Sequence, residues 1–453
     1  MTKSRSTHDR RRLLILPVGA ALIILAASAV VPFAPSKAQA PVANSPYSIS
    51  IFATSVPGQY TQPGAILFDS GSIYIAYNNG AALDGSSGST TIVQYSTSGA
   101  VGHMYTIPGG NAALKAEPLT GHIWVLQNPQ ANPALTIINP ATNVQTSYAF
   151  GPTAHGGGYG DLAFLAGEPY ISASNPSVNP NTAPAIVHVT ATQASTGNIA
   201  NVTPVLAGNA TATATLTGST VTLNLLSPLT LEFDTLNDLL LNDQADSQLV
   251  FVHNPNAADQ SVYTTPLTLS SNPTQIGNTS FVTSVNGMLL VSDPGAETVY
   301  AVTRAAFSDG KVYTTAPGGI VAKVDLDSGA LTPVVTGLST PTRVSFVPSS
   351  DYRLSFTPGG PTVTTSGGTV IVIADTNRQG GSVGNVTVQT VAPLPKGIKM
   401  TTANPLVISG GTAVVELKVK PNLAVGVYGI PFTATDSNGR IRKATLLVQV
   451  VQN

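Results

Sequence analysis

The 453-residue chain has no cysteine and few charged side chains. The absence of cysteine excludes disulfide bonds and thiolate metal sites, so the fold must be stabilised by burial alone. Asp, Glu, Lys and Arg make up 9% of the residues, against about 25% in an average globular protein. Because few ion pairs exist for protonation to break, we expect the folded chain to tolerate acidic solution.

Basic residues are almost missing from the larger part of the chain. Between Pro41 and Thr303 the only Lys or Arg is Lys115, against thirteen acidic residues, whereas Arg304 to Asn453 hold thirteen basic and seven acidic residues. Binding to nucleic acid needs many Lys and Arg side chains, so nucleic acid is excluded as a partner of the first segment. The acidic segment suits cations, and the basic one suits either that segment or an anionic cell-surface polymer.

Long apolar runs are also missing, apart from one at the N-terminus. Arg10 to Arg12 precede an apolar run from Leu13 to Val31, and Ala38-Gln39-Ala40 then offers small residues for cleavage. This order is typical of a secretory signal peptide over residues 1–40, with cleavage near Ala40. The run is also long enough to be an uncleaved anchor, which would be the only contact with a membrane. We therefore predict a secreted, periplasmic or cell-surface protein.

What the chain does have is an internal repeat. Five segments read as a strand, a polar turn and a second strand, and their first turn residues are spaced by 50, 47, 69 and 50 residues: Tyr77, Gln127, Ser174, Asp243 and Asp293. A period near 50 built from paired strands is typical of a β-propeller with one blade per repeat. With an irregular sixth segment from Gly318, the pattern predicts about six blades over residues 41–350. Five and seven blades are the alternatives, because outer strands are hard to assign from a sequence.

Segments around the repeats predict how the blades are completed. Opening strands are expected from Pro63, Tyr159, Pro228 and Thr279, each shortly before a repeat. The alternating segment Ser48 to Thr54 is expected to pair into the last blade and close the ring. The long third interval, near Thr190 to Leu226, is expected to add a hairpin on one face.

Residues 351–453 change in character. They read as short alternating strands separated by Gly, Pro, Asn and Asp turns, a pattern typical of a β-sandwich. The predicted fold class is therefore all-β: a β-propeller of about six blades, followed by an immunoglobulin-like β-sandwich over residues 351–453.

Two groups of segments resemble known families. LLVSDPGAETVYAV from Leu289 and VAKVDLDSGALTPVVTGLSTP from Val321 resemble the six-bladed propellers of the NHL and SMP-30-like superfamily, over about residues 48 to 347. LPKGIKM, SGGTAVVELKV and GVYGIPFTATDSNG resemble bacterial immunoglobulin-like modules of surface proteins. These resemblances imply an exported bacterial propeller joined to a surface module.

The SMP-30-like resemblance also implies an activity. Such enzymes are lactonases that hold one divalent cation at the mouth of the central channel with Glu, Asn and Asp. In this chain four aspartates stand at comparable strand ends in different blades: Asp69, Asp161, Asp243 and Asp293. No Glu is expected on an opening strand, and this departure from the family pattern counts against lactonase activity.

The densest acidic cluster is the candidate metal site. It comprises Glu232, Asp234, Asp238, Asp243 and Asp246, and carboxylate oxygens are ligands that suit calcium. Propeller turns also use Asp to bond their own backbone, so turn formation is the alternative. Asp243 and Asp293 occupy equivalent positions and would share a cation if both faced the central channel. The predicted metal residues are Asp243, Asp293, Asp246 and Asp234, with calcium as the ion, and no catalytic residue is predicted.

The function predicted from these features is binding. We expect an exported cell-surface or extracellular binding or scaffold protein that presents a propeller on an immunoglobulin-like module. Its ligand would be a carbohydrate or a cell-envelope polymer. The alternatives are a metal-dependent hydrolase of the lactonase type, or a lyase, acting in the propeller channel, and a structural subunit of a surface layer.

Overall fold

The structure is a computed structural model that describes residues 40–165, 167–193, 197–233, 238–308, 310–349, 351–379, 384–391, 393–437 and 441–452. The predicted signal segment therefore lies almost wholly outside the described residues. Within them the only helical element is the 3-10 turn η1 (Pro294–Ala296), and no helix has the length and apolarity needed to cross a membrane.

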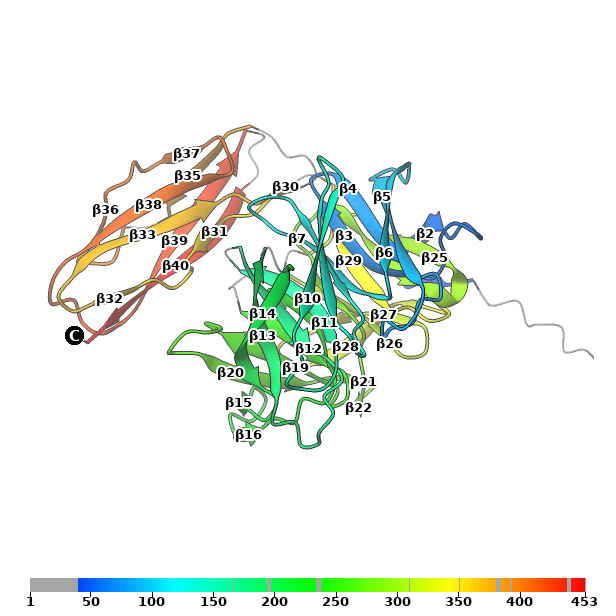
Figure 1. Ribbon diagram of the computed structural model, residues 1–453. Helices are drawn as coiled ribbons and strands as arrows, with labels where there is room; N and C mark the ends of the chain where they lie inside the picture. Colours follow the sequence, from blue (N-terminus) through cyan, green and yellow to red (C-terminus); the bar gives the residue numbers. More distant parts are fainter. Residues whose placement is uncertain are drawn as a thin grey trace, which may run out of the picture. The chain divides into compact units, whose positions relative to one another are not determined.

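Among the described residues, strand pairing and strand contacts give six four-stranded blades in a closed ring, which confirms the predicted propeller. Figure 1 labels most of their strands. Each blade has an innermost strand beside the channel, and the innermost strands follow one another around the ring in chain order. From inside outward, blades 1 to 3 are β3 (Pro63–Asp69), β4 (Ser72–Tyr77), β5 (Ser89–Ser96), β6 (Val101–Pro108); β7 (Asn111–Ala116), β8 (Ile123–Gln127), β9 (Ala134–Asn139), β10 (Val144–Phe150); β11 (Tyr159–Leu165), β12 (Glu168–Ala173), β13 (Pro184–Thr192), β14 (Ile199–Ala207).

The other three blades have the same plan, although two of them draw on distant segments. From inside outward, blades 4 to 6 are β17 (Pro228–Phe233), β18 (Leu239–Asp243), β19 (Gln248–His253), β20 (Ser261–Pro266); β23 (Thr279–Phe281), β26 (Val312–Ala316), β27 (Ile320–Val324), β28 (Ala330–Thr336); β29 (Arg343–Pro348), β24 (Gly287–Asp293), β25 (Thr298–Thr303), β2 (Ser48–Thr54). The five repeats of the sequence are thus the second and third strands of blades 1, 2, 3, 4 and 6.

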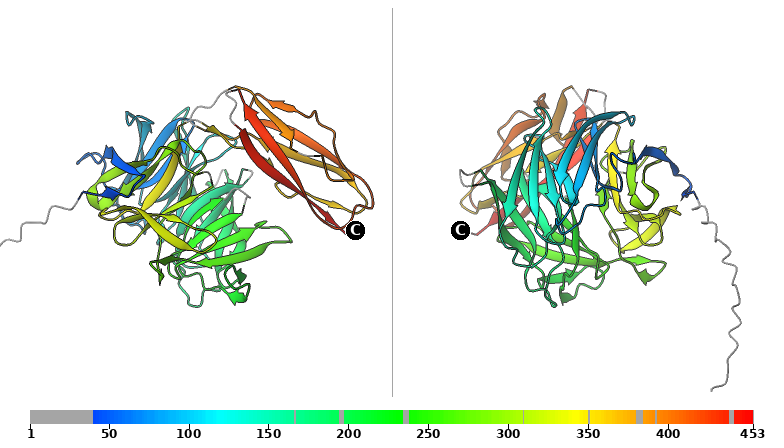
Figure 2. Two further views of the ribbon diagram at one scale, coloured as in Figure 1. Left: turned by 180° about the vertical axis from the view of Figure 1, so that it is seen from behind. Right: turned by 45° about the vertical axis from the view of Figure 1, so that its right-hand side comes forward.

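Blades 5 and 6 exchange strands. The sequence predicts β23 as the opening strand of the repeat that follows it, but β23 pairs with β26, and β24 pairs with β29. The chain therefore leaves blade 5 after its innermost strand, forms the middle of blade 6, and returns to complete blade 5. Figure 2 shows the propeller strands from two further sides.

Ring closure and the long insertion follow the predictions. β2 pairs antiparallel with β25 at the outer edge of blade 6, as expected of the segment from Ser48. The insertion forms the hairpin β15 (Thr211–Ala214) and β16 (Thr220–Thr222), and β15 extends blade 4 by a parallel pairing with β20. A second hairpin, β21 (Thr268–Leu269) and β22 (Asn272–Pro273), extends blade 5 in the same way, and β1 (Val42–Ala43) pairs with β28 as well.

Apolar packing lies between the blades. Six hydrophobic clusters each join one pair of neighbouring blades around the ring. The second strands are apolar on both faces because each face meets another blade: all five residues of β18 are buried. The centre of the ring is consequently left to polar side chains.

Polar side chains also fasten adjacent blades. Ser172 Oγ on β12 donates to Leu229 O on β17 at 3.0 Å, and Ser292 Oγ on β24 donates to Gly64 O on β3 at 2.6 Å. In both cases the second strand of one blade holds the start of the next innermost strand. The starts of the innermost strands, where the channel opens, are thereby fixed.

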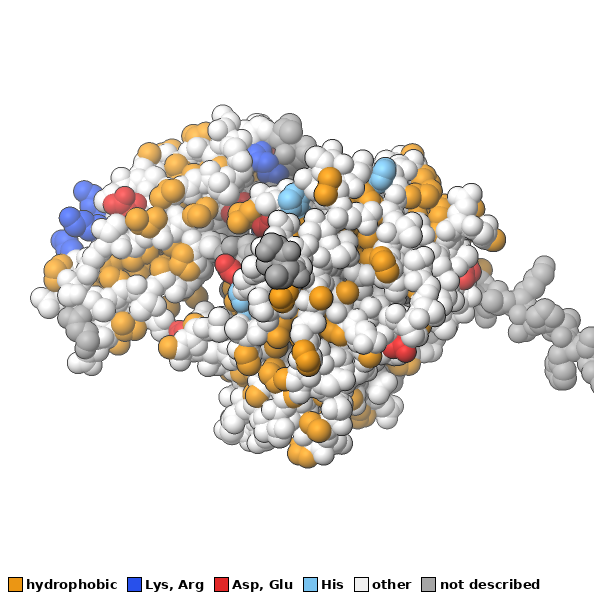
Figure 3. Space-filling view, in the orientation of Figure 1, with side chains coloured by type: hydrophobic (Ala, Val, Ile, Leu, Met, Phe, Trp, Pro, Cys, Tyr) orange, Lys and Arg blue, Asp and Glu red, His pale blue; other side chains and the backbone are white. Residues whose placement is uncertain are grey.

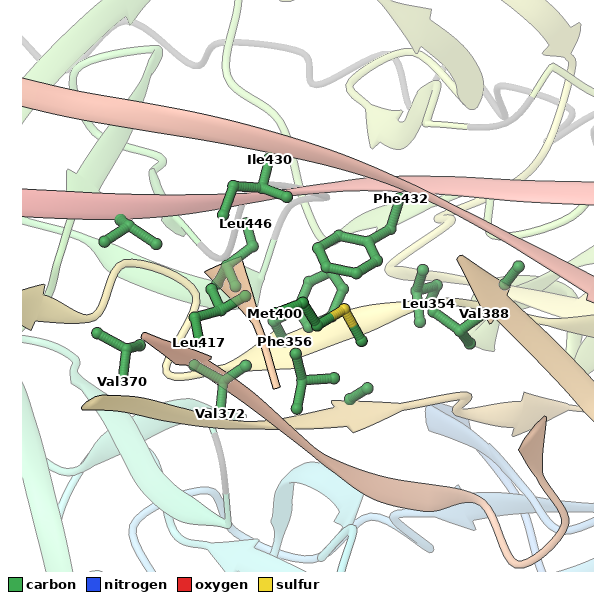
Figure 4. Close-up of a cluster of buried hydrophobic side chains, with 14 of the residues drawn as sticks. Leu354, Phe356, Val370, Val372, Val388, Met400, Leu417, Ile430, Phe432 and Leu446 are labelled. Carbon is green, nitrogen blue, oxygen red and sulfur yellow. The ribbon is translucent and has the colours of Figure 1, made fainter. Parts of the chain in front are cut away.

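The C-terminal strands form the predicted sandwich. One sheet is ordered β31–β33–β38–β36, the other β32–β40–β39–β35–β37, and β30 pairs with β34. Phe356 and Phe432 come from the two sheets and pack with ring centroids 4.7 Å apart in the core (Figure 4). The strands are β30 (Asp351–Tyr352), β31 (Ser355–Thr357), β32 (Thr362–Thr364), β33 (Gly368–Asp375), β34 (Arg378–Gln379), β35 (Val386–Thr390), β36 (Ile398–Met400), β37 (Leu406–Ile408), β38 (Thr412–Val419), β39 (Gly426–Asp436) and β40 (Ile441–Val451).

Candidate functional site

The central channel contains a small polar cavity of about 40 Å³. Every innermost strand contributes to its lining, with one representative from each blade being Ala65, Lys115, Asp161, Glu232, Thr279 and Arg343. We call Lys115, Asp161, Glu232 and Arg343 the central charge cluster. Two positive and two negative side chains thus meet where apolar packing is absent.

Lys115 and Glu232 form the one direct ion pair of this cluster. Lys115 Nζ lies 2.5 Å from Glu232 Oε2, and the two side chains are 27% and 25% exposed. Burial lowers the pKa of Lys115, but the carboxylates of Glu232 and Asp161 outweigh that effect, so the net direction is upward. Lys115 is therefore held as a cation that links blades 2 and 4.

The side chains of Asp161 and Arg343 are held by hydrogen bonds to backbone groups. Asp161 accepts hydrogen bonds from the backbone of Leu162 at 2.8 Å and of Leu231 at 3.2 Å. Arg343 begins β29 in blade 6, and its Nη2 donates to Ala112 O in blade 2 at 2.6 Å. Burial lowers the pKa of Arg343, and the Asp161 carboxylate acts in the opposite direction.

The sequence did not predict that the four residues of the central charge cluster lie together. No Glu is expected on an opening strand from the sequence, yet Glu232 lies on β17, the innermost strand of blade 4, and lines the cavity. Lys115 stands out in the sequence only as an exception in composition. The usable signal was that the single basic residue between Pro41 and Thr303 stands within an opening strand, β7.

A groove lies over one end of the channel. It has a volume of about 430 Å³ and is lined by the starts of β17, β23 and β29 and by the turns after β18 and β26; we call it the mouth groove. Its lining includes Leu229, Gln244, Pro317, Thr340, Thr342 and Arg343. Arg343 lines both the mouth groove and the channel cavity, so the two spaces are neighbours at this residue.

Asp243, Asp246 and Asp293, three of the predicted metal residues, line neither the channel cavity nor the mouth groove. Asp293 ends β24 in blade 6, and its two oxygens accept hydrogen bonds from the backbone of Ser339 at 2.8 Å and of Thr340 at 2.7 Å. Asp243 ends β18 in blade 4 and accepts one from the backbone of Ser227 at 2.8 Å. Both carboxylates thus hold the chain just before an innermost strand, with blade 5 between them.

The calcium site stays a prediction. Asp246 lies in the turn after β18, and Asp234 lies outside the described residues. Where the structure describes the chain, it brings no three His, Asp or Glu side chains together as a metal ion would require. Burial raises the pKa of Asp243 to about 7, partly offset by the Ser227 amide and reinforced by the negative charge of Asp246.

Comparison with known proteins finds only distant likeness to solved structures. The sequence matches no protein-family model and no curated protein. Among solved structures, a streptogramin B lyase is 12% identical with a TM-score of 0.37, covering 87% of this chain and 93% of that one. The virginiamycin B lyase from Staphylococcus aureus is 10% identical with a TM-score of 0.37, covering 88% and 99%.

A third similar structure is an extracellular domain. The extracellular domain of the hybrid two-component system BT4673 from B. thetaiotaomicron is 10% identical with a TM-score of 0.32, covering 90% of this chain and 60% of that one. The lyases and this domain are β-propellers. Likeness at these values carries no argument about activity, so function has to be inferred from the site.

Proposed function

We propose that the protein is an exported binding protein, in which the mouth groove binds a small ligand and the immunoglobulin-like module docks to a component of the cell envelope. The observation that carries the proposal is the mouth groove itself, with Arg343 in the lining of both the groove and the channel cavity. Its volume of about 430 Å³ lies within the range of about 300 to 1,000 Å³ that small-molecule sites occupy.

The groove is built to hold its shape. Asp293 fixes the backbone of Ser339 and Thr340, and Thr340 Oγ1 in turn accepts a hydrogen bond from the backbone of Gly295 at 2.8 Å. A site whose walls are already fixed loses little conformational entropy when a ligand enters. Apolar walls such as Leu229 beside amide and hydroxyl groups suit a ligand with both kinds of surface.

The state of the central charge cluster favours binding over metal-dependent hydrolysis. The Lys115 ammonium occupies the Glu232 carboxylate, and Asp161 already accepts two backbone hydrogen bonds. A divalent cation would have to compete with a lysine for the same oxygen atoms. The lactonase or lyase alternative therefore requires the ion pair to open first.

A variant that fills the groove tests the proposal. Thr342 is exposed and lines the groove, so Thr342→Trp should fill it without disturbing the core. Against a library of small acids, amides, sugars and peptides, the mature protein should show thermal shifts that Thr342→Trp abolishes. Hits that survive the variant, or no hits at all, would contradict the proposal. Metal-dependent turnover of lactones would instead support the alternative of a hydrolase. Self-assembly of the protein without ligand would support the alternative of a surface-layer subunit.

A further inference from the structure

Arg343 carries an unusually incomplete set of partners for a charged group inside a protein. Its guanidinium has five N–H donors, and the hydrogen bond that the structure describes for them goes to Ala112 O. No ion pair that the structure describes includes Arg343, so no carboxylate of the described residues pairs directly with it. Charges inside a protein are normally paired with an opposite charge, and Arg343, which is half-buried, has room for such a partner.

The neighbouring negative group does not fill that role. Asp161 lies near enough to influence Arg343 electrostatically, yet both of its oxygens accept hydrogen bonds from backbone amides of β11 and β17. The cavity of about 40 Å³ that both residues line exceeds the roughly 10 to 15 Å³ needed by one water. An anionic group of a few atoms would therefore fit at Arg343.

Thr279 supplies a second, independent observation. Its side chain is 2% exposed and lines the same cavity, and its Oγ1 has no hydrogen-bond partner among the described atoms. Burying a hydroxyl without a hydrogen-bond partner is unfavourable, because the group loses its hydrogen bonds to water. A ligand oxygen at this place would accept a hydrogen bond from it.

We propose that Arg343 and Thr279 bind the carboxylate of a small monoanionic ligand, whose remaining atoms lie in the mouth groove. The inference rests on the proposed function, because the groove must hold the body of the ligand. The guanidinium fork matches the two oxygens of a carboxylate, and Thr279 adds a third hydrogen bond.

The charges around the cavity select a carboxylate over phosphate. Glu232 neutralises Lys115, so Arg343 is the one cation of the cluster without a directly paired carboxylate. A second negative charge on the ligand would meet Asp161 and Glu232 without a further cation to balance it. Residues 41–349 carry sixteen acidic and five basic residues, a net charge of −11, which also disfavours dianions.

The experiment compares matched acids and amides. Calorimetry and thermal shift on the mature protein use benzoate, cyclohexanecarboxylate and mandelate, each beside its neutral carboxamide, with phosphate and sulfate as further probes. We expect at least one carboxylate to bind about tenfold or more tightly than its amide, since a charge-assisted hydrogen bond contributes about 1.5 to 3 kcal/mol. Tighter binding of phosphate than of any carboxylate would overturn the choice of ligand class.

Three variants connect that preference to the site. Arg343→Gln should abolish the preference for acid over amide, whereas Arg343→Lys should retain part of it, because it keeps the charge and loses the fork. Thr279→Val should weaken carboxylate binding without destabilising the free protein, because Thr279 Oγ1 has no internal partner to lose. A Thr279→Val protein that melts lower and binds normally would show an ordinary structural role and contradict the proposal.

The outcomes separate this inference from the proposed function. If amides and acids bind equally, and Thr342→Trp but not Arg343→Gln abolishes both, the groove is a binding site and the carboxylate inference fails alone. If Thr342→Trp changes no binding in any arm, the proposed function fails as well.

Discussion

At the scale of single residues, Asp243 shows how burial alters a carboxyl group. Its folded-state pKa of about 7 lies above its ordinary value, so the folded protein binds that proton more tightly than the unfolded chain. The resulting stabilisation is complete below about pH 4 and is lost as the pH rises through about 7. We therefore expect the wild-type protein to be more stable at pH 5 than at pH 8, in keeping with tolerance of acid.

Asp243→Asn removes the titrating group and keeps an oxygen acceptor for the Ser227 amide. The variant should melt higher than wild type at pH 8 and equally at pH 4, with a difference bounded by about 4 kcal/mol. Thermal melts at several pH values measure this. Asp246→Asn is the control and should have a smaller effect of the same sign, and an Asp243→Asn protein that is less stable at every pH would refute the prediction.

Replacing Asp293, unlike replacing Asp243, should destabilise the folded protein. Asp293→Ala leaves the amides of Ser339 and Thr340 without their acceptor, which should cost about 2 to 4 kcal/mol in urea unfolding. Because both residues line the mouth groove, ligand affinity should fall too. Asp293→Asn, which keeps an acceptor, is the milder control.

Calcium added to wild type tests the metal prediction directly: a rise in melting temperature that Asp293→Ala removes would show a cation site at this turn.

The acidic residues could be found from the sequence, but their roles could not. Asp243 and Asp293 stand out because each ends a repeated apolar strand, and local turn chemistry accounts for both. Lys115, Glu232 and Arg343 meet only because six blades close a ring, and their separation along the chain hides this. Which side chain of an innermost strand faces the channel depends on that closure.

At the scale of elements, β36 and β38 of the sandwich bring two like charges together. Lys399 lies directly opposite Lys418 across the antiparallel pair, and both are exposed. Like charges in this position destabilise a sheet. Figure 3 shows blue side chains gathered on the sandwich, whereas the propeller face in view is mostly uncharged. This pair is therefore the place at which we test the proposed docking of the module to an anionic polymer.

Lys399→Glu should separate stability from binding. It replaces repulsion with an opposite-charge pair, so the melting temperature should rise. The gain in the free energy of unfolding should be less than about 1 kcal/mol. Retention on dextran sulfate should meanwhile fall, with elution at lower salt. Lys443→Glu on β40 makes the same change in net charge on the other sheet and should leave retention closer to wild type. Equal losses in both variants would indicate net charge rather than this pair.

The exchange between blades 5 and 6 shows the limit of element prediction. Strands from Thr279 and from Thr340 both look like opening strands, and their local sequences do not say which one pairs with β24. The repeat located β24 and β25 correctly because apolar strands and turns are local features. Pairing between strands far apart in the chain is decided by packing that no local window contains.

At the scale of the whole molecule, the fold class was predictable and the ligand was not. A period near 50 is a property of the whole propeller, and alternation with regular turns is a property of the whole sandwich. Both patterns therefore predict the fold class even where single strands are assigned wrongly. The site depends on four side chains and on the loops of three blades. The charges and hydrogen-bonding groups of the site come together only when the four side chains and the three blades are in place.

Blade 6 has a consequence for the order in which the protein can form. It combines β2, near the start of the propeller, with β24 and β25 and with β29, which ends at Pro348. An emerging chain that stops before β29 lacks the strand that carries Arg343, and its ring stays open. The mouth groove and the channel cavity therefore cannot be complete until the chain has been synthesised as far as Pro348, although β2 of the same blade is made almost three hundred residues earlier.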